Sequence, residues 1–315
     1  MATQDSDKNN MVAVSGATGF LGKELVRLFF KSDQIVIPLM RKDFEGSVEE
    51  LSEKINGVGA IFHFAGEPVL QRWTSGTKKK ILESRVKTTR MLVEAVEMAD
   101  DKPDVFFSAS AVGIYDIYEV HDEFSSNYEN DFLTEVCLAW EREAMKLFGK
   151  YDIRLVIGRL GVVLGNAGGA FPGIKKAMQM GVGNKIGDGF QGFPFIHIAD
   201  FLTAMWFLWK RSSCKGVFNI VAPQMVSNYE FADELVRVSG KKPFMNVPVW
   251  ALKAVFGEGA SMFTKGPKVV PGRFQNVNFP FQYPDIRSTL EDLWNAKEKS
   301  QTEYWISPDS LMPEE

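Results

Sequence analysis

A glycine-rich turn directly after a short apolar segment is the feature that most constrains what this 315-residue chain can fold into. Residues 11–14 are predicted to form a buried parallel strand, and apolar residues at helical spacing predict a helix that starts near Phe20. In such a strand–turn–helix unit, glycines permit a sharp turn, a close approach of a pyrophosphate and tight helix packing, and the helix N-terminus attracts phosphate. The segment therefore predicts a dinucleotide site. The residues expected to contact the dinucleotide at this turn are Gly16, Thr18, Gly19, Phe20, Leu21 and Gly22.

The end of the second predicted strand, residues 35–40, indicates which dinucleotide is bound. An Asp or Glu usually meets the ribose 2′-hydroxyl of NAD at this point, about 20 residues past the glycines. Here Arg41 follows Gly22 by 19 residues, and a guanidinium suits the 2′-phosphate of NADP. Asp43 stands two residues later and leaves NAD(H) open as the alternative. The sequence therefore favours NADP(H) over NAD(H).

Further along the chain, short apolar segments alternate with segments of helical periodicity. Strands are predicted at residues 35–40, 58–64, 104–108, 154–160, 195–198 and 217–221, and helices at 47–56, 78–99, 132–148 and 200–209. This alternation predicts an α/β protein with a doubly wound (Rossmann), mostly parallel sheet. Because a helix follows the second strand so closely, we expect the usual third strand of such sheets to be missing or vestigial.

Two stretches interrupt the alternation and predict a second, smaller unit. Residues 165–192 are rich in glycine, and prolines recur after residue 223. Ligands bind at the carboxyl edge of open α/β sheets, so we expect these stretches to form a C-terminal substrate lobe over that edge. The prediction assigns residues 11–165 and 195–222 to the dinucleotide-binding domain, and residues 166–194 and 223–315 to the lobe.

Composition argues against several classes of partner. A net charge of −4 without a long basic stripe speaks against nucleic-acid binding. Cys137 and Cys214 have no metal-ligand spacing, so no metal site and no disulfide are predicted. A polar start and the lack of a run of about 20 apolar residues predict no signal peptide, no membrane span and a cytoplasmic protein. Of the histidines, His121 in its acidic loop is expected to be solvated, and His197 to be a core residue.

Several motifs together resemble one enzyme superfamily. They are His63-Phe64-Ala65-Gly66, Ser108-Ala109-Ser110, Arg159 to Gly165 and Phe195 to Asp200. With the glycine turn, they resemble the extended short-chain dehydrogenases/reductases. Further motifs narrow the resemblance to the epimerase-like subgroup that ends in a small C-terminal domain of unknown function. These are Ala65-Gly66-Glu67-Pro68, Ser110 to Tyr115, Trp140-Glu141 and Gly187 to Gln191.

The resemblance implies roles for individual residues. It implies cofactor contacts for Phe64, Ala65, Gly66, Arg85 and Ser108. It also implies that Ser110 hydrogen-bonds the reacting oxygen of the substrate. The alternatives are that Ser110 is an ordinary serine at the end of a strand and that Arg85 is a cation on a helix surface.

The catalytic pattern of the superfamily is incomplete in this chain. Its enzymes pair a tyrosine with a lysine four residues later, which lowers the pKa of the phenol. Depending on a one-residue shift, the pair falls here on Phe132 and Val136 or on Leu133 and Cys137. Neither alternative supplies a phenol or an ammonium, and Tyr128 also lacks a lysine four residues later.

Two residues are candidates to replace the missing pair. Tyr115 follows Ser110 closely, and its alternative role is that of a packed aromatic. Glu67 follows the third sheet strand, and its alternative role is a loop salt bridge with Arg72. Arg159 and Gln191 are expected to face the substrate.

These observations lead to two functional hypotheses. The first is an NADP(H)-dependent oxidoreductase or epimerase-like enzyme that acts on a small polar molecule; a sugar nucleotide is suggested by family analogy alone. The second is a non-catalytic NADP(H)-sensing protein that acts through a protein partner. The resemblance is also compatible with a homodimer.

Overall fold

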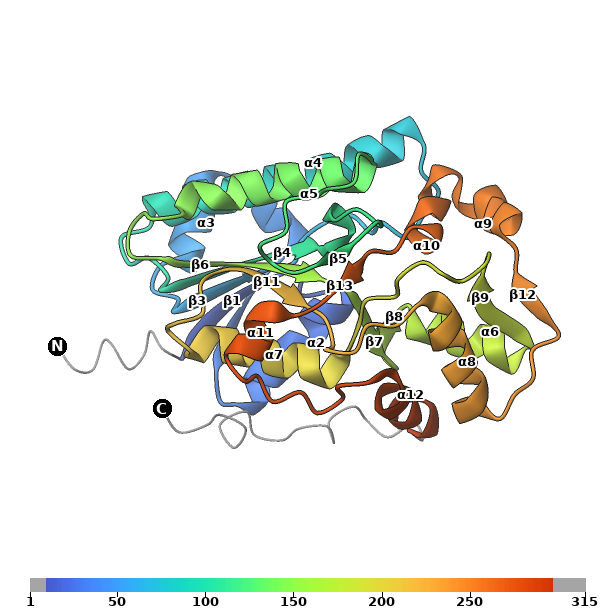
Figure 1. Ribbon diagram of the computed structural model, residues 1–315. Coiled ribbons are helices and arrows are strands. Elements are labelled where there is room, and N and C mark those ends of the chain that lie inside the picture. Colours follow the sequence, from blue (N-terminus) through green and yellow to red (C-terminus); the bar gives the residue numbers. More distant parts are fainter. Residues whose placement is uncertain (1–9, 297–315) are drawn as a thin grey trace.

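A six-stranded parallel sheet forms the centre of the computed structural model, which describes residues 10–296 (Figure 1). In spatial order the strands are β2 (Ile35–Leu39), β1 (Met11–Ser15), β3 (Ala60–His63), β4 (Val105–Ala111), β6 (Arg154–Leu160) and β11 (Gly216–Ile220). Every neighbouring pair is parallel. The predicted doubly wound α/β fold is confirmed.

The sheet ends at β2, where a further strand would be expected in the six-stranded dinucleotide fold. After β2 the chain forms a short 3₁₀ turn, η1 (Arg41–Phe44), and then helix α3 (Val48–Ile55), before it enters β3 on the far side of β1. Ser47 caps α3 by accepting a hydrogen bond from the Glu50 N–H. Within residues 10–296 no strand lies beyond β2, so the predicted loss of the third strand is confirmed.

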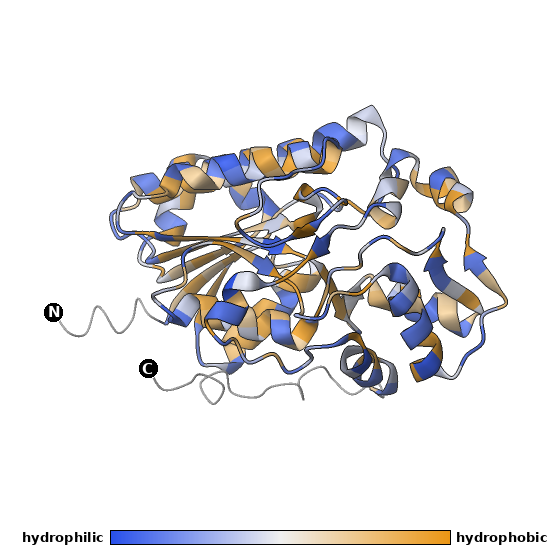
Figure 2. Ribbon diagram, viewed as in Figure 1, coloured by the Kyte–Doolittle hydropathy of each residue, from blue (hydrophilic) through white to orange (hydrophobic). Residues whose placement is uncertain are grey.

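Helices cover both faces of the sheet (Figure 1). One face carries α3, α4 (Ser75–Met98) and α5 (Phe132–Ala144), which continues into η3 (Met145–Leu147); the other carries α2 (Phe20–Lys31) and α7 (Ile198–Lys210). Along β1, Val12 and Val14 pack with the α2–α7 layer, whereas Ala13 packs with α3 and α4. Because both faces are buried, the strands are mostly apolar, as Figure 2 shows.

A smaller unit, which contains the C-terminal segment, lies beyond the carboxyl edge of the sheet (Figure 1). Its core is separate from the two cores of the sheet and includes Phe171, Phe231 and Leu290. Its elements are β7 (Val162–Gly165), β8 (Gly168–Gly169), α6 (Phe171–Gln179), β9 (Val182–Ile186), β10 (Phe195–His197), α8 (Asn228–Ser239), β12 (Met245–Val247), α9 (Val249–Phe256), η4 (Glu258–Ala260), α10 (Ser261–Thr264) and α12 (Ile286–Asn295). The strand predicted at 195–198 is β10, which pairs with β7 outside the central sheet.

Residues 254–276, near the C-terminal end of the described chain, return from this unit to the Rossmann half. Strand β13 (Lys268–Val269) pairs with β5 (Val120–His121), and helix α11 (Gly272–Asn276) packs beside β11. The Trp73 N–H donates to the Phe256 carbonyl, and the Arg72 guanidinium donates to the carbonyls of Ala254 and Val255. The segment therefore bridges the two units near the carboxyl edge of the sheet.

None of the helices within residues 10–296 has the length and apolarity that a membrane-spanning helix requires.

We expect the turn between β1 and α2 to tolerate no side chain at Gly22. A Cβ there would lie 2.2 Å from the Gly16 carbonyl oxygen, and that backbone atom cannot rotate away. Gly22→Ala should lower the free energy of unfolding by about 3 kcal/mol, the upper end of the usual cost of overpacking. The measurement is urea denaturation.

Gly173→Ala is the matched control, because a Cβ at Gly173 in α6 meets no atom within 4 Å. It should stabilise the protein by about 0.5–1 kcal/mol through helix propensity. Equal stabilities for Gly22→Ala and wild type would contradict the close packing of this turn.

Candidate functional site

The turn from β1 into α2 has the shape of a phosphate site. Gly16 has φ +70°, and a Cβ there would lie 2.9 Å from the Phe64 carbonyl carbon, so this position favours glycine both in conformation and in space. Gly19 is the N-cap of α2, and no side chain caps the helix. The first turn also contains no acidic residue. Its N–H groups and the positive end of the helix dipole are thus suited to the pyrophosphate of a dinucleotide.

Phe20 contributes to this turn through its backbone, because its ring has another role. The ring lies against Gly165, Gly168 and Gly169 of the β7–β8 hairpin, where a Cβ would approach it to within about 3 Å. The glycines of the hairpin thereby let the smaller unit pack directly on the start of α2.

A hydrogen-bond chain under the loop after β3 fixes that loop beside the turn. The Ser15 hydroxyl oxygen accepts from the N–H groups of Phe64 (3.0 Å) and Ala65 (3.2 Å), and it lies 2.6 Å from His63 Nδ1. His63 Nε2 lies 2.9 Å from the Thr89 hydroxyl, which itself donates to the Arg85 carbonyl. Because Thr89 uses its proton there, His63 must donate from Nε2 and accept the Ser15 proton at Nδ1. Complete burial, with a contribution from the Arg85 charge, lowers the pKa of His63 to about 3.

Arg85, on α4, packs against this loop and is not a solvated cation on the helix surface. Its guanidinium donates to the Glu67 carbonyl at 2.9 Å and lies over the face of Gly66, where a Cβ would be 2.9 Å from Cζ. It also lies 5.1 Å from the centre of the Trp140 ring. Burial lowers the pKa of Arg85. Arg72, considered above as a partner of the Glu67 side chain, donates to Ala254 and Val255 instead.

Arg41 and Asp43, the two candidates for contact with the cofactor ribose, both lie in η1 just after β2, and they point in different directions. The Asp43 carboxylate accepts from the Met40 N–H at 2.6 Å and from Lys54 Nζ at 2.7 Å. These bonds hold Asp43 inside the η1 turn. The Arg41 side chain is 88% exposed and lies 3.6 Å from Glu45. Of these two side chains, Arg41 is the one that can reach an incoming ligand.

A buried polar network lies at the carboxyl ends of β4 and β6. Ser110 on β4 and Arg159 on β6 are register neighbours, and Glu141 lies on α5 above them. The Ser110 hydroxyl donates to Glu141 Oε1 at 2.6 Å, and Arg159 donates from Nε and Nη2 to the two carboxylate oxygens, each at 2.9 Å. Ser110, Arg159 and Glu141 are 2%, 3% and 8% exposed.

The same network places Tyr115 and Arg159 differently from what the sequence suggested. Arg159 Nη1 donates to the Tyr115 hydroxyl (2.8 Å), which donates to Asn219 Oδ1 (2.9 Å). Tyr115 is 1% exposed, and burial raises its pKa to about 12. This geometry does not support proton exchange between Tyr115 and a substrate, and it fits the alternative of a packed aromatic. Arg159 Nη2 also lies 3.3 Å from the Tyr128 hydroxyl, so each of its guanidinium nitrogens has a partner within the protein.

Gln191 also has partners within the protein. Its side-chain amide donates to the carbonyls of Ile186 (3.2 Å) and Phe263 (2.9 Å), and so ties the glycine-rich loop to α10.

Of the two alternatives for the missing pair, Leu133 and Cys137 lie nearer the end of β4. Leu133 lies against Gly113, and the Cys137 Sγ lies 3.8 Å from the Ala111 carbonyl, so Leu133 and Cys137 face the end of β4. Burial raises the pKa of Cys137 to about 11, which keeps its thiol neutral at pH 7. Glu141 stands one helical turn after Cys137 and was not identified as a site residue from the sequence. An acidic residue at helical spacing on an otherwise apolar face was the signal for it.

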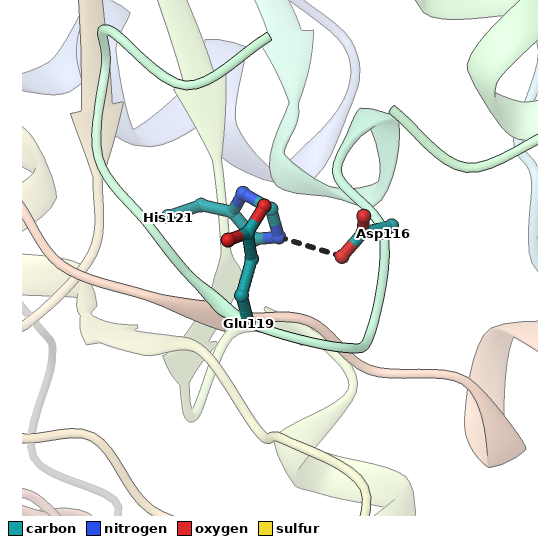
Figure 3. Close-up of side chains that lie close together, drawn as sticks. All are labelled: Asp116, Glu119 and His121. Carbon is teal, nitrogen blue, oxygen red and sulfur yellow. Dashed lines mark hydrogen bonds and ion pairs between the residues drawn. The ribbon is translucent and has the colours of Figure 1, made fainter. Parts of the chain in front are cut away.

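The loop after Tyr115 holds a cluster of Asp116, Glu119 and His121, drawn in Figure 3. His121 Nε2 lies 3.0 Å from Asp116 Oδ1, and its ring stacks on Tyr115 at 4.8 Å between centres. His121 is fully buried, so the prediction that it is solvated is wrong, because the ring fills the space beside Tyr115. Potential metal-ligand atoms of the three residues lie within 4.8 Å of one another, but Glu119 bonds to Asn127 and Asp116 also accepts the Tyr118 N–H. These partners explain the cluster as an ordered loop.

His197 agrees with the sequence prediction of a core histidine. It is fully buried, accepts the Ala199 N–H at Nδ1 and contacts Asp292 through Nε2.

Comparison with known proteins covers most of the chain. Residues 12–221 match the NAD dependent epimerase/dehydratase family, and residues 247–293 match a domain of unknown function, DUF1731. An epimerase family protein of Staphylococcus saprophyticus is 35% identical over 292 residues, which cover 89% of this chain and 98% of that protein.

Two solved structures are also similar. The crystal structure of the human epimerase family protein SDR39U1 with NADPH is 29% identical, has a TM-score of 0.83, and covers 91% of this chain and 100% of that one. A UDP-glucuronic acid 4-epimerase of Bacillus cereus with UDP-glucuronic acid and NAD has a TM-score of 0.73, at 19% identity, over 90% of this chain and 98% of that one. At that identity it supports the fold alone.

The buried His63 predicts acid sensitivity. Between pH 6.5 and about 3 the unfolded chain binds a proton at this residue and the folded chain does not. The contribution of His63 to stability is therefore present above pH 6.5 and is lost as the pH falls, by up to about 1.4 kcal/mol per pH unit. Urea denaturation of wild type and His63→Gln at pH 7 and pH 5 measures it. The variant should lose less stability over this interval, and equal losses would contradict the assignment.

Proposed function

The chain belongs to the NAD dependent epimerase/dehydratase family, and we propose that it is an NADP(H)-dependent oxidoreductase or epimerase-like enzyme acting on a small polar substrate. The observation that carries the proposal is the junction of two features at one sheet edge. One is a phosphate turn without a side-chain cap at Gly19, and the other is a buried serine, Ser110, at the end of β4. The bound cofactor would supply or accept a hydride at the nicotinamide C4.

The preference for NADP(H) rests on the end of β2. Asp43 is held by Met40 and Lys54, whereas Arg41 points outward. A guanidinium there matches a 2′-phosphate and offers nothing specific to a 2′-hydroxyl. The human relative crystallised with NADPH supports the same choice, although the more distant epimerase holds NAD.

Replacement of Arg41 tests the cofactor preference. Arg41→Ala should weaken NADPH binding about 5- to 150-fold, which corresponds to about 1–3 kcal/mol for the loss of a charge-assisted contact. NADH binding should change less than about twofold, because NADH carries no 2′-phosphate. Titration calorimetry measures both affinities.

Lys42→Ala removes the neighbouring cation of the same turn and serves as the control, with a smaller expected effect on NADPH binding. Equal losses of NADPH and NADH affinity in Arg41→Ala would overturn the assignment of the 2′-phosphate site.

A second candidate function is a non-catalytic NADP(H)-sensing protein that acts through a protein partner. Leu133 and Cys137 at the positions of the usual pair favour it, since neither exchanges a proton near pH 7. The bridge from Arg72 and Trp73 to residues 254–257 would give such a protein a route from the cofactor site to the C-terminal segment.

Hydride transfer separates the two functions. NADPH deuterated stereospecifically at C4 is incubated with the protein and a defined mixture of small aldehydes, ketones and nucleoside-diphosphate sugars, and mass spectrometry follows the deuterium. An enzyme transfers the label, and Ser110→Ala should reduce the transfer about 100-fold with NADPH affinity unchanged.

Ser52→Ala removes a buried serine on α3, away from the site, and should retain transfer. If the wild-type protein leaves the label on the cofactor, the enzyme function is rejected in favour of the sensing protein. Unchanged transfer by Ser110→Ala would reduce Ser110 to a structural residue.

A further inference from the structure

The direction of one hydrogen bond bears on how the site moves a proton. A serine hydroxyl has a single proton, and Ser110 donates it to Glu141 Oε1 at 2.6 Å. The lone pairs of Ser110 Oγ remain to accept. A substrate oxygen placed at Ser110 would therefore meet an acceptor, and a substrate hydroxyl would complete the chain by donating to it.

Glu141 is held in position to accept this hydrogen bond. The Arg159 fork holds both carboxylate oxygens at 2.9 Å, which fixes the plane of the carboxylate and directs Oε1 at Ser110. Arg159 is in turn fixed by Tyr115 at 2.8 Å. The other titratable group facing this carboxylate is Cys137, one helical turn earlier on α5, and Arg85 from α4 lies near that thiol. The buried thiol is neutral and does not compete for the proton.

We propose that Ser110 and Glu141 form the proton-transfer couple of this site, with Arg159 as the residue that positions it. The inference rests on the proposed oxidoreductase function. When the carbon of a substrate alcohol gives up its hydride to the oxidised cofactor, the hydroxyl proton passes to Ser110 Oγ, and the serine's own proton passes to Glu141 Oε1. The substrate leaves as a carbonyl compound, and Glu141 is left protonated until it exchanges with water. Reduction is the reverse.

Ser110 and Glu141 would carry out the proton transfer that a tyrosine and a lysine perform in the usual arrangement. In the usual arrangement the phenol carries the proton and the ammonium lowers its pKa. Here α5 contains no lysine, and Ser110 reaches the carboxylate of Glu141 directly.

Tyr128 is the competing proton carrier. Its hydroxyl lies 3.3 Å from Arg159 Nη2, and it is about one-third exposed. If Tyr128→Phe abolishes turnover while Glu141→Gln retains it, the phenol carries the proton and the couple is rejected.

The kinetic experiment uses the full chain and the product alcohol identified by deuterium transfer, oxidised with NADP⁺ and followed by absorbance at 340 nm. Glu141→Gln keeps an acceptor for Ser110 but cannot take its proton, so turnover should fall at least about 100-fold. Glu141→Asp should restore part of it. NADP⁺ affinity should stay within about twofold in each variant.

Glu143→Gln is the matched control. Glu143 lies on the same helix, is similarly buried and is paired with Arg90 and Lys146, away from Ser110. Its turnover should stay within about threefold of wild type. A comparable loss in both variants would show that the effect comes from a buried charge in α5 and would overturn the couple.

A second measurement needs neither cofactor nor turnover. Protein labelled with [δ-¹³C]glutamate gives a carboxyl resonance for Glu141, identified by its loss in Glu141→Gln. Ser110→Ala should shift this resonance and leave that of Glu143 in place. An unmoved Glu141 resonance would show that the hydrogen bond is absent and would overturn the proposal, whatever the fate of the oxidoreductase function. If no label leaves NADPH in the earlier experiment, the oxidoreductase function fails and the couple fails with it.

Discussion

The close approach of three backbone segments around Gly16 and Gly22 is the constraint on which the rest of the structure depends. A Cβ at Gly22 would lie 2.2 Å from the Gly16 oxygen, and a Cβ at Gly16 would lie 2.9 Å from the carbonyl carbon of Phe64. Without side chains at these two positions, α2 starts directly on the end of β1, and the loop after β3 lies against the same turn. This contact sets the bare N–H groups of α2 beside the loop that Ser15 and His63 hold.

The buried ion pair of Glu141 and Arg159 organises the carboxyl ends of β4 and β6, away from the glycine turn along the same sheet edge. Burying two charges is costly unless each is paired and hydrogen-bonded, and here both conditions are met. The pair joins α5 to β6 and collects Ser110 and Tyr115 into one network. It lies directly beside the end of β4, and the same carboxylate that neutralises Arg159 also accepts the Ser110 hydrogen bond.

Much of the fold and part of the site followed from local pattern. Apolar segments at residues 58–64, 104–108 and 154–160 became central strands because both faces of the sheet are buried, and the short span between β2 and α3 excluded a third strand there. The strand at 195–198 was foreseen, but not that it leaves the central sheet for β7, since strand pairing is a long-range choice. The hydrogen bonds of Tyr115 could not be foreseen for a similar reason, because its partners, Arg159 and Asn219, lie 44 and 104 residues away.

The sequence by itself determined the strand–turn–helix unit, the doubly wound topology and the absence of the tyrosine and lysine, because each depends on residue type and spacing within a short segment. Tertiary structure alone decided that Asp43 is tied to Lys54 while Arg41 faces outward. It also decided that Ser110 donates to Glu141 and that Arg159 pairs with Glu141. The physical reason is that a hydrogen bond assigns each proton to one acceptor, and which acceptor is near depends on how strands and helices distant in sequence pack together.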